Sequence, residues 1–127
     1  MRLFIVRHAK AAPGEPDELR PLTKGGRAAA RDLGERLAGE QPDAVVSSPL
    51  LRARETAEAI ARASGLELET DDRLAPGADA AAVRAVVDCH GETVVVVGHQ
   101  PDCSEIVFEL TGRQVPFSTG AFLEVAL

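Results

Sequence analysis

Three segments of this chain place basic side chains just beyond a short apolar run. Arg7 and His8 follow the apolar residues 3–6, and His99 follows the four consecutive valines at 94–97. Arg52 comes shortly after a third apolar run. Guanidinium groups bind phosphoryl oxygens through paired hydrogen bonds, and a neutral imidazole can attack phosphorus without a separate base. These residue types therefore predict phosphoryl chemistry, for which an imidazole can serve as the nucleophile.

A metal site fits the same residues less well. Catalytic zinc requires a third histidine or a carboxylate beside His8 and His99. The guanidinium groups of Arg7 and Arg52 would also repel a cation. We therefore expect neither a metal nor another cofactor.

The apolar runs predict the elements that bring these side chains together. Runs without polar residues, such as 3–6 and 94–97, are typical of strands buried on both faces of a sheet. Residues 44–46 predict a shorter strand of the same kind. Parallel strands end at one edge of the sheet, and ligands of open α/β proteins bind outside that edge.

Capping residues predict where the helices begin. Ser48 followed by Pro49 predicts a helix that runs to Gly65, with Arg52 in its first turn. The free N–H groups at such a helix start attract anions, which adds to the charge of Arg52. Within this helix, Arg54 is expected to pair with Glu58 at the i+4 position.

The remaining segments alternate in the same way. A helix capped by Thr23 is expected to reach Gly39, a second capped by Asp79 to end near Gly91, and a third to span about 102–110. Residues 66–69 and 121–127 are expected to be strands. Strands alternating with helices predict an α/β protein, a three-layer α/β/α sandwich with a mostly parallel central sheet, formed by one domain over residues 1–127.

Composition excludes several classes of function. The formal net charge of −6 argues against nucleic acid or an anionic membrane surface as a partner. The longest apolar run is too short to span a membrane, and the N-terminus does not resemble a signal peptide, so we expect a cytoplasmic protein. Cys89 and Cys103 lack a CxxC spacing and are expected to be free, buried thiols.

Four motifs in this order resemble the histidine phosphatase superfamily, also called phosphoglycerate mutase-like. The motifs are Arg7-His8, Pro21-Leu22-Thr23 followed by Gly26, Ser48-Pro49-Leu50-Leu51-Arg52-Ala53-Arg54-Glu55-Thr56, and Gly98-His99-Gln100-Pro101. The small size resembles the SixA-type phosphohistidine phosphatase branch. The resemblance implies that His8 is the nucleophile and becomes transiently phosphorylated. It further implies that Arg7 and Arg52 hold the phosphoryl oxygens and that His99 donates to them.

The chain departs from the family pattern where a general acid is expected. Larger members take a Glu or Asp from the segment that corresponds to 71–79. Asp72 and Asp79 are the candidates there, but a turn residue and a helix cap are the better interpretations. Without an acid, a labile P–N bond is a better substrate than an alkyl phosphate. Thr119, just before the last strand, is a further candidate for binding substrate.

The sequence thus predicts a phosphatase that acts through a phosphohistidine intermediate, with a phosphohistidine-bearing protein as substrate. A small-molecule phosphomonoesterase or a mutase of the same superfamily, acting on a small phosphate ester, is the alternative. A phosphate-binding module without activity is an alternative of another class, but it has no need of a nucleophile such as His8.

Overall fold

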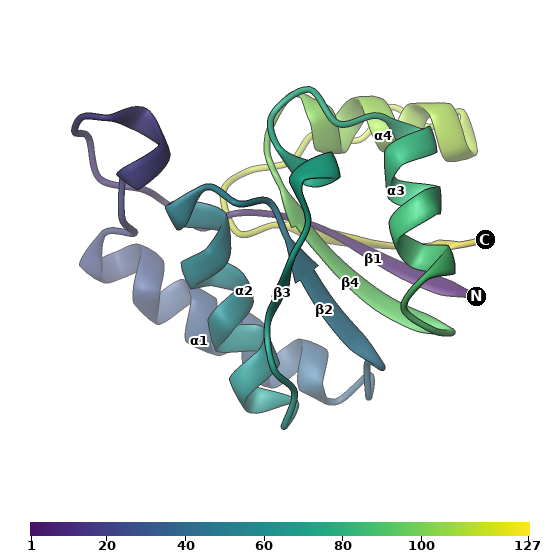
Figure 1. Ribbon diagram of the computed structural model, residues 1–127, viewed down its shortest axis with the longest axis horizontal. Helices are drawn as coiled ribbons and strands as arrows, with labels where there is room; N and C mark the ends of the chain where they lie inside the picture. Colours follow the sequence, from purple (N-terminus) through teal and green to yellow (C-terminus); the bar gives the residue numbers. More distant parts are fainter.

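Five strands form one sheet in the computed structural model, which describes residues 1–127 (Figure 1). The strands are β1 (Arg2–Arg7), β2 (Ala44–Ser47), β3 (Glu69–Thr70), β4 (Thr93–Gly98) and β5 (Phe122–Ala126). Their order is β3-β2-β4-β1-β5, and only β5 runs antiparallel to its neighbour. This confirms the predicted α/β fold with a mostly parallel sheet.

The register of the two central strands places their polar ends side by side. β1 pairs with β4 so that Arg7 lies opposite Gly98. The residues that follow, His8 and His99, therefore leave the sheet at the same level. Both strands are apolar on both faces because they lie in the middle of the sheet and each face is covered by helices.

Two helices cover each face of the sheet (Figure 1). The helices α1 (Lys24–Ala38) and α2 (Leu51–Ala63) pack on the side of Phe4 and Val6. The helices α3 (Ala80–Asp88) and α4 (Asp102–Thr111) pack on the side of Leu3 and Ile5. Successive residues of a strand point to opposite faces, so β1 contributes alternately to the two halves of the core.

A small residue allows α1 and α2 to approach closely. A Cβ atom at Gly34 of α1 would lie 2.7 Å from the carbonyl oxygen of Ala59 in α2. Backbone contact at this point holds both helices tightly against the same face of the sheet.

Several predicted elements differ from the structure. α2 begins at Leu51, and Ser48 does not cap it; instead the Ser48 hydroxyl accepts a hydrogen bond from the N–H of Leu50 at 3.2 Å. Of the predicted strand at 66–69, only Glu69 belongs to the two-residue β3, which pairs with β2 at Val46 and Ser47. Leu66 and Leu68 pack against the core cluster beneath α2 without pairing. Other expectations hold: Thr23 and Asp79 cap α1 and α3.

Two expected side-chain environments are also wrong. Glu58 pairs with Arg62 at 3.4 Å and not with Arg54. Cys103 is buried and free as expected, whereas Cys89 follows the end of α3 and is exposed.

None of the helices combines the length and the apolarity needed to cross a lipid bilayer.

Candidate active site

His8 and His99 face each other across the ends of β1 and β4. Their ring centroids are 5.3 Å apart, with 59° between the ring planes. Arg7 is the last residue of β1, and Arg52 is the second residue of α2. The positive charges of both arginines act on both imidazoles. The four predicted site residues therefore lie together at the carboxyl edge of the sheet.

A backbone contact fixes which ring nitrogen of His8 is basic. Nδ1 of His8 lies 2.7 Å from the carbonyl oxygen of Ala9. A carbonyl can only accept, so Nδ1 carries the proton and the lone pair is on Nε2. Burial, followed by the charges of Arg52 and Arg7, lowers the pKa of His8, while the bond to Ala9 opposes this shift. The ring is therefore neutral at physiological pH.

His99 is held by a hydroxyl group in the connection between β2 and α2. Its Nε2 lies 2.7 Å from Oγ of Ser48, which directly follows β2. Burial lowers the pKa of His99 to about 4, with smaller contributions from His8 and Arg52. Nδ1 of His99 is buried and has no hydrogen-bond partner within the protein. The Ser-Pro pair predicts that Ser48 is a helix cap, and no local pattern indicates its contact with His99.

Arg52 is anchored by an acidic residue in the loop after β1. Its side chain donates to the carbonyl oxygen of Asp17 at 3.0 Å and to Oδ2 of Asp17 at 3.2 Å. The other carboxylate oxygen of Asp17 accepts from Arg20 at 3.1 Å. Hydrogen bonds from Arg20 and Arg52 lower the pKa of the Asp17 carboxyl. Asp17 thus joins two guanidinium groups beside the histidines.

Thr56 links α2 to the segment that carries His8. Its hydroxyl donates to the carbonyl oxygen of Arg52 at 2.8 Å and accepts from the N–H of Ala9 at 3.0 Å. Both contacts are buried. Because Ala9 and Arg52 adjoin the site, this one side chain fixes the distance between β1 and the start of α2.

Thr56 belongs to a motif visible in the sequence, whereas no sequence pattern marks Asp17. The spacing of Arg52 and Thr56 by four residues places the hydroxyl beneath the preceding turn of the helix, where it reaches a carbonyl oxygen. Asp17 lies in a proline-containing loop, in the short 3₁₀ helix η1 (Asp17–Leu19), where no periodicity marks it.

Thr119 lies next to the site but makes no side-chain hydrogen bond. The N–H of the adjacent Gly120 donates to the carbonyl oxygens of Arg7 and His8 at 3.1 and 3.0 Å. The turn before β5 therefore rests on the end of β1. Thr119 itself is exposed, and its hydroxyl forms no hydrogen bond.

The two acid candidates are accounted for by local structure. The Asp79 carboxylate accepts from the N–H of Ala82 at 2.9 Å, as expected of a helix cap. Asp72 is an exposed residue that begins the 3₁₀ helix η2 (Asp72–Leu74). Neither carboxylate contacts His8 or His99. No three His, Cys, Asp or Glu side chains converge in the chain in a way that could hold a metal ion.

Comparison with known proteins agrees with this geometry. Residues 3–76 match the family model of the histidine phosphatase superfamily (branch 1). An uncharacterized protein of Picosynechococcus is 35% identical over 91% of this chain and 78% of its own length. A Haemophilus influenzae homologue of the phosphohistidine phosphatase SixA is 31% identical over 93% of this chain and 82% of its own.

Among solved structures, that of the protein histidine phosphatase SixA in complex with tungstate superimposes with a TM-score of 0.88. It is 32% identical, and the match covers all of this chain and 88% of that one. The family match, which includes the first strand and the start of α2, extends over more than half of the sequence. The chain therefore belongs to the histidine phosphatase superfamily and is a SixA-like hydrolase.

Proposed function

We propose that the protein hydrolyses a phosphohistidine-bearing protein through a covalent phosphohistidine on Nε2 of His8, and that residues 1–127 act as one catalytic domain. One observation carries the proposal. The bond from Nδ1 of His8 to Ala9 leaves Nε2 unprotonated, in a ring whose lowered pKa keeps it neutral. A neutral imidazole beside two guanidinium groups is a nucleophile already paired with an oxyanion site.

The reaction proceeds in two displacements. In the first, Nε2 of His8 attacks phosphorus, a P–N bond forms, and the P–N bond of the substrate breaks. The bonding electron pair goes to the leaving imidazole nitrogen, which takes a proton from solvent. In the second, water attacks the phosphoryl group on His8, and the P–Nε2 bond breaks with its electron pair returning to Nε2. Inorganic phosphate leaves with the oxygen of the water, whose released proton goes to solvent.

The surrounding groups act on the phosphoryl oxygens. Arg7 and Arg52 neutralise the negative charge and hold the group in line with Nε2 of His8. The negative charge of a bound phosphoryl group favours the protonated form of His99, which then donates a hydrogen bond to it. Losing one such aimed donor typically costs about 3–4 kcal/mol of transition-state stabilisation.

The choice of a phosphohistidine substrate rests on the leaving group. The carboxylate of Asp79 is used to cap α3, and Asp72 is exposed on η2, so neither is positioned as a general acid. A labile P–N bond depends less on such an acid than a P–O bond to an alkyl group does. The relatives described as protein histidine phosphatases support the same choice.

A single-turnover experiment tests this proposal. The protein is mixed with a radiolabelled phosphohistidine protein, and the label on the enzyme is tested for stability in alkali and acid. We expect label that survives alkali, is lost in acid, and is absent in His8→Ala. Undiminished turnover by His8→Ala would end the proposal. Release of phosphate from small esters alone would favour the phosphomonoesterase or mutase alternative, and phosphate binding without any labelled enzyme would favour a binding module.

A further inference from the structure

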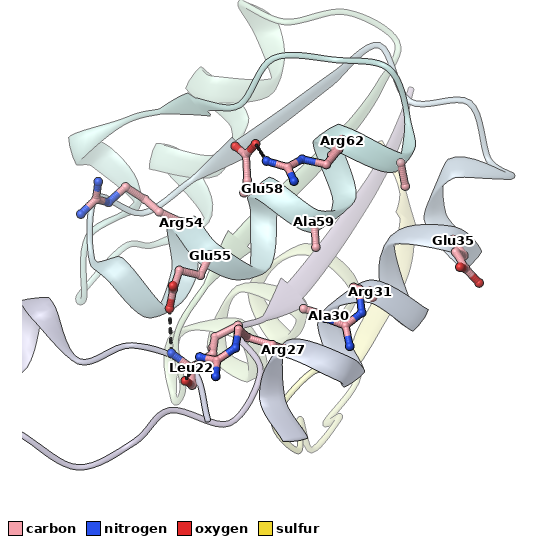
Figure 2. A pocket seen from close by; sticks show the side chains of 11 residues that line it. Leu22, Arg27, Ala30, Arg31, Glu35, Arg54, Glu55, Glu58, Ala59 and Arg62 are labelled. Carbon is pink, nitrogen blue, oxygen red and sulfur yellow. Dashed lines mark hydrogen bonds and ion pairs between the residues drawn. The ribbon is translucent and has the colours of Figure 1, made fainter. Parts of the chain in front are cut away.

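A groove between α1 and α2 lies outside the site described above. It has a volume of about 640 Å³. Leu22 and Ala30 lie buried beneath its floor, and Ala59 and Ala63 contribute the exposed apolar surface (Figure 2). Its rim carries four of the chain's arginines and three glutamates. The arginines are Arg27, Arg31, Arg54 and Arg62, and the glutamates are Glu35, Glu55 and Glu58.

The ion pairs within the groove leave an excess of positive charge. Arg62 pairs with Glu58 at 3.4 Å, and Glu55 accepts from the N–H of Leu22 at 2.7 Å. Arg27, Arg31 and Arg54 have no carboxylate partner, and Nε of Arg54 is buried without any hydrogen-bond partner. Against these three arginines stand two acids of the rim without a cationic partner, Glu35 and Glu55, because Glu55 is bonded to a neutral backbone N–H. Arg27 also donates to the carbonyl oxygen of Leu22 at 2.9 Å. With four arginines and three glutamates, the rim carries a net charge of +1, opposite in sign to the net charge of −6 of the whole protein.

The groove begins beside the active site. Arg54 follows the site residue Arg52 by two positions on α2, and Leu22 ends the loop that contains Asp17. Both helices start at the edge of the sheet where β1 ends (Figure 1). Arg54 and Arg62 lie about 12 Å apart along α2, so the groove is long enough for about two turns of a second helix lying along it.

We propose that this groove docks an acidic amphipathic helix of a phosphohistidine-bearing substrate protein. The inference rests on the proposed function, since it supplies a second contact for the same substrate. Apolar residues of the docked helix pack on the alanine floor, and its carboxylates pair with Arg27, Arg31 and Arg54. The groove therefore selects among phosphoproteins by a feature remote from the phosphoryl group.

Binding is measured first, with His8→Ala protein so that catalysis plays no part. The probe is a fluorescent helical peptide with Leu and Ala on one face and Glu on the other, and its counterpart has Lys in place of Glu. We expect the Glu peptide to bind and the Lys peptide not to bind. Introducing R31E/R54E into the His8→Ala protein should weaken binding of the Glu peptide about tenfold. A higher salt concentration should also weaken this binding.

A matched control makes the same charge change elsewhere. Arg84 on α3 and Arg113 after α4 are exposed and have no ion pair. R84E/R113E should bind the Glu peptide within about twofold of the parent protein if the groove is the binding site. The proposal would be overturned if both double variants lost the same affinity for the Glu peptide. It would also be overturned if the parent protein did not bind this peptide. R31E alone, at an exposed position, repeats the test should R31E/R54E not fold.

Turnover separates this inference from the proposed function. The substrates are phosphoramidate and the Glu peptide extended by about ten Gly and Ser residues to a phosphohistidine. R31E/R54E should hydrolyse phosphoramidate at the normal rate but lose about tenfold in kcat/KM for the peptide, through KM. Equal kcat/KM for the peptide in both double variants would contradict docking. Failure of the unaltered protein to hydrolyse either substrate would instead contradict the proposed function.

Discussion

His8 and His99 are kept neutral by the same surroundings that would bind a phosphoryl group. Both rings are buried, and both feel the charges of Arg7 and Arg52. Protonation of His8 would place a third positive charge among them and remove the lone pair from Nε2. The proposed nucleophile and the proposed anion site therefore support each other.

The pH dependence of kcat/KM should reflect this arrangement. Since the pKa of His8 is lowered from 6.5, the acid limb of kcat/KM for phosphoramidate should lie below pH 6.5. Activity is then retained at pH 6.5 and lost as the pH falls through the lowered value. The rates are corrected for spontaneous hydrolysis measured without protein. An acid limb at or above pH 6.5 would show that burial and the arginines do not control His8.

Asp17 provides a second test at this scale. In D17N the carboxylate that holds Arg52 loses its charge, although its shape is kept. We expect kcat/KM for phosphoramidate to fall about fivefold, because the Asp17 side chain is more than half exposed and its ion pair is partly screened. The matched control is E18Q, at an exposed neighbour whose side chain forms no hydrogen bond or ion pair. An equal effect of D17N and E18Q would assign no positioning role to Asp17.

The sequence could predict the four basic residues but not the groups that hold them. His8 and His99 follow unbroken apolar runs, so the topology of the sheet alone brings them to one edge. The contacts of Ser48 and Asp17 depend on tertiary structure. Ser48 precedes Pro49 and has every local feature of a helix cap, yet its hydroxyl lies beside His99. No pattern in the sequence records that a loop folds back onto Arg52.

At the scale of elements, the site depends on how closely α2 lies against α1 and the sheet. The backbone contact at Gly34 sets this distance for the helix that carries Arg52. The alanines on the facing surfaces also leave room for the groove between the two helices. This close contact therefore joins the two helices that form the groove, and one of them carries Arg52 in its first turn.

Substitution of Gly34 by alanine should destabilise the protein. Alanine favours a helix over glycine by about 1 kcal/mol, but its Cβ would lie 2.7 Å from the carbonyl oxygen of Ala59 and force the helices apart. We expect a net loss of about 1–2 kcal/mol in the free energy of unfolding, measured with urea. G25A in the first turn of α1 is the control, because its Cβ meets nothing closer than 3.9 Å. A stability of G34A equal to that of G25A would contradict the close contact.

Boundaries of elements were harder to predict than the elements themselves. The long apolar runs of β1 and β4 mark buried strands, and capping residues mark α1 and α3. β3 lacks such a signal: Leu66 and Leu68 alternate with acidic residues as in a strand, but they pack beneath α2 before the chain reaches β2. The alternation is real, and it reflects burial without strand pairing.

Considered as a whole, the molecule should lose stability in mild acid because of its active site. The pKa of His99 is about 4 in the folded protein and about 6.5 in the unfolded chain. The unfolded state binds more protons between these values, so stability is complete above pH 6.5 and falls as the pH drops toward 4. Over this range the titration of His99 lowers the free energy of unfolding by about 3 kcal/mol. The lowered pKa of His8 reduces stability in the same direction.

Thermal unfolding between pH 7 and pH 4 measures this effect. H99Q removes the titrating group, so its Tm should fall less steeply over this range than that of the unaltered protein. Its stability at neutral pH is compared separately, because the contact with Ser48 also changes. An identical pH dependence of Tm in both proteins would show that protonation of His99 does not cause the loss of stability in acid.

The two ends of the chain lie together at the amino end of β1. The N–H of Leu127 donates to the carbonyl oxygen of Met1 at 2.9 Å, and Arg2 pairs with Ala126 across β1 and β5 (Figure 1). His8 leaves the opposite end of the same strand. A tether attached at either end, to a solid support or to a reporter protein, would therefore leave the catalytic edge pointing away from the attachment, open to a partner as large as another folded protein.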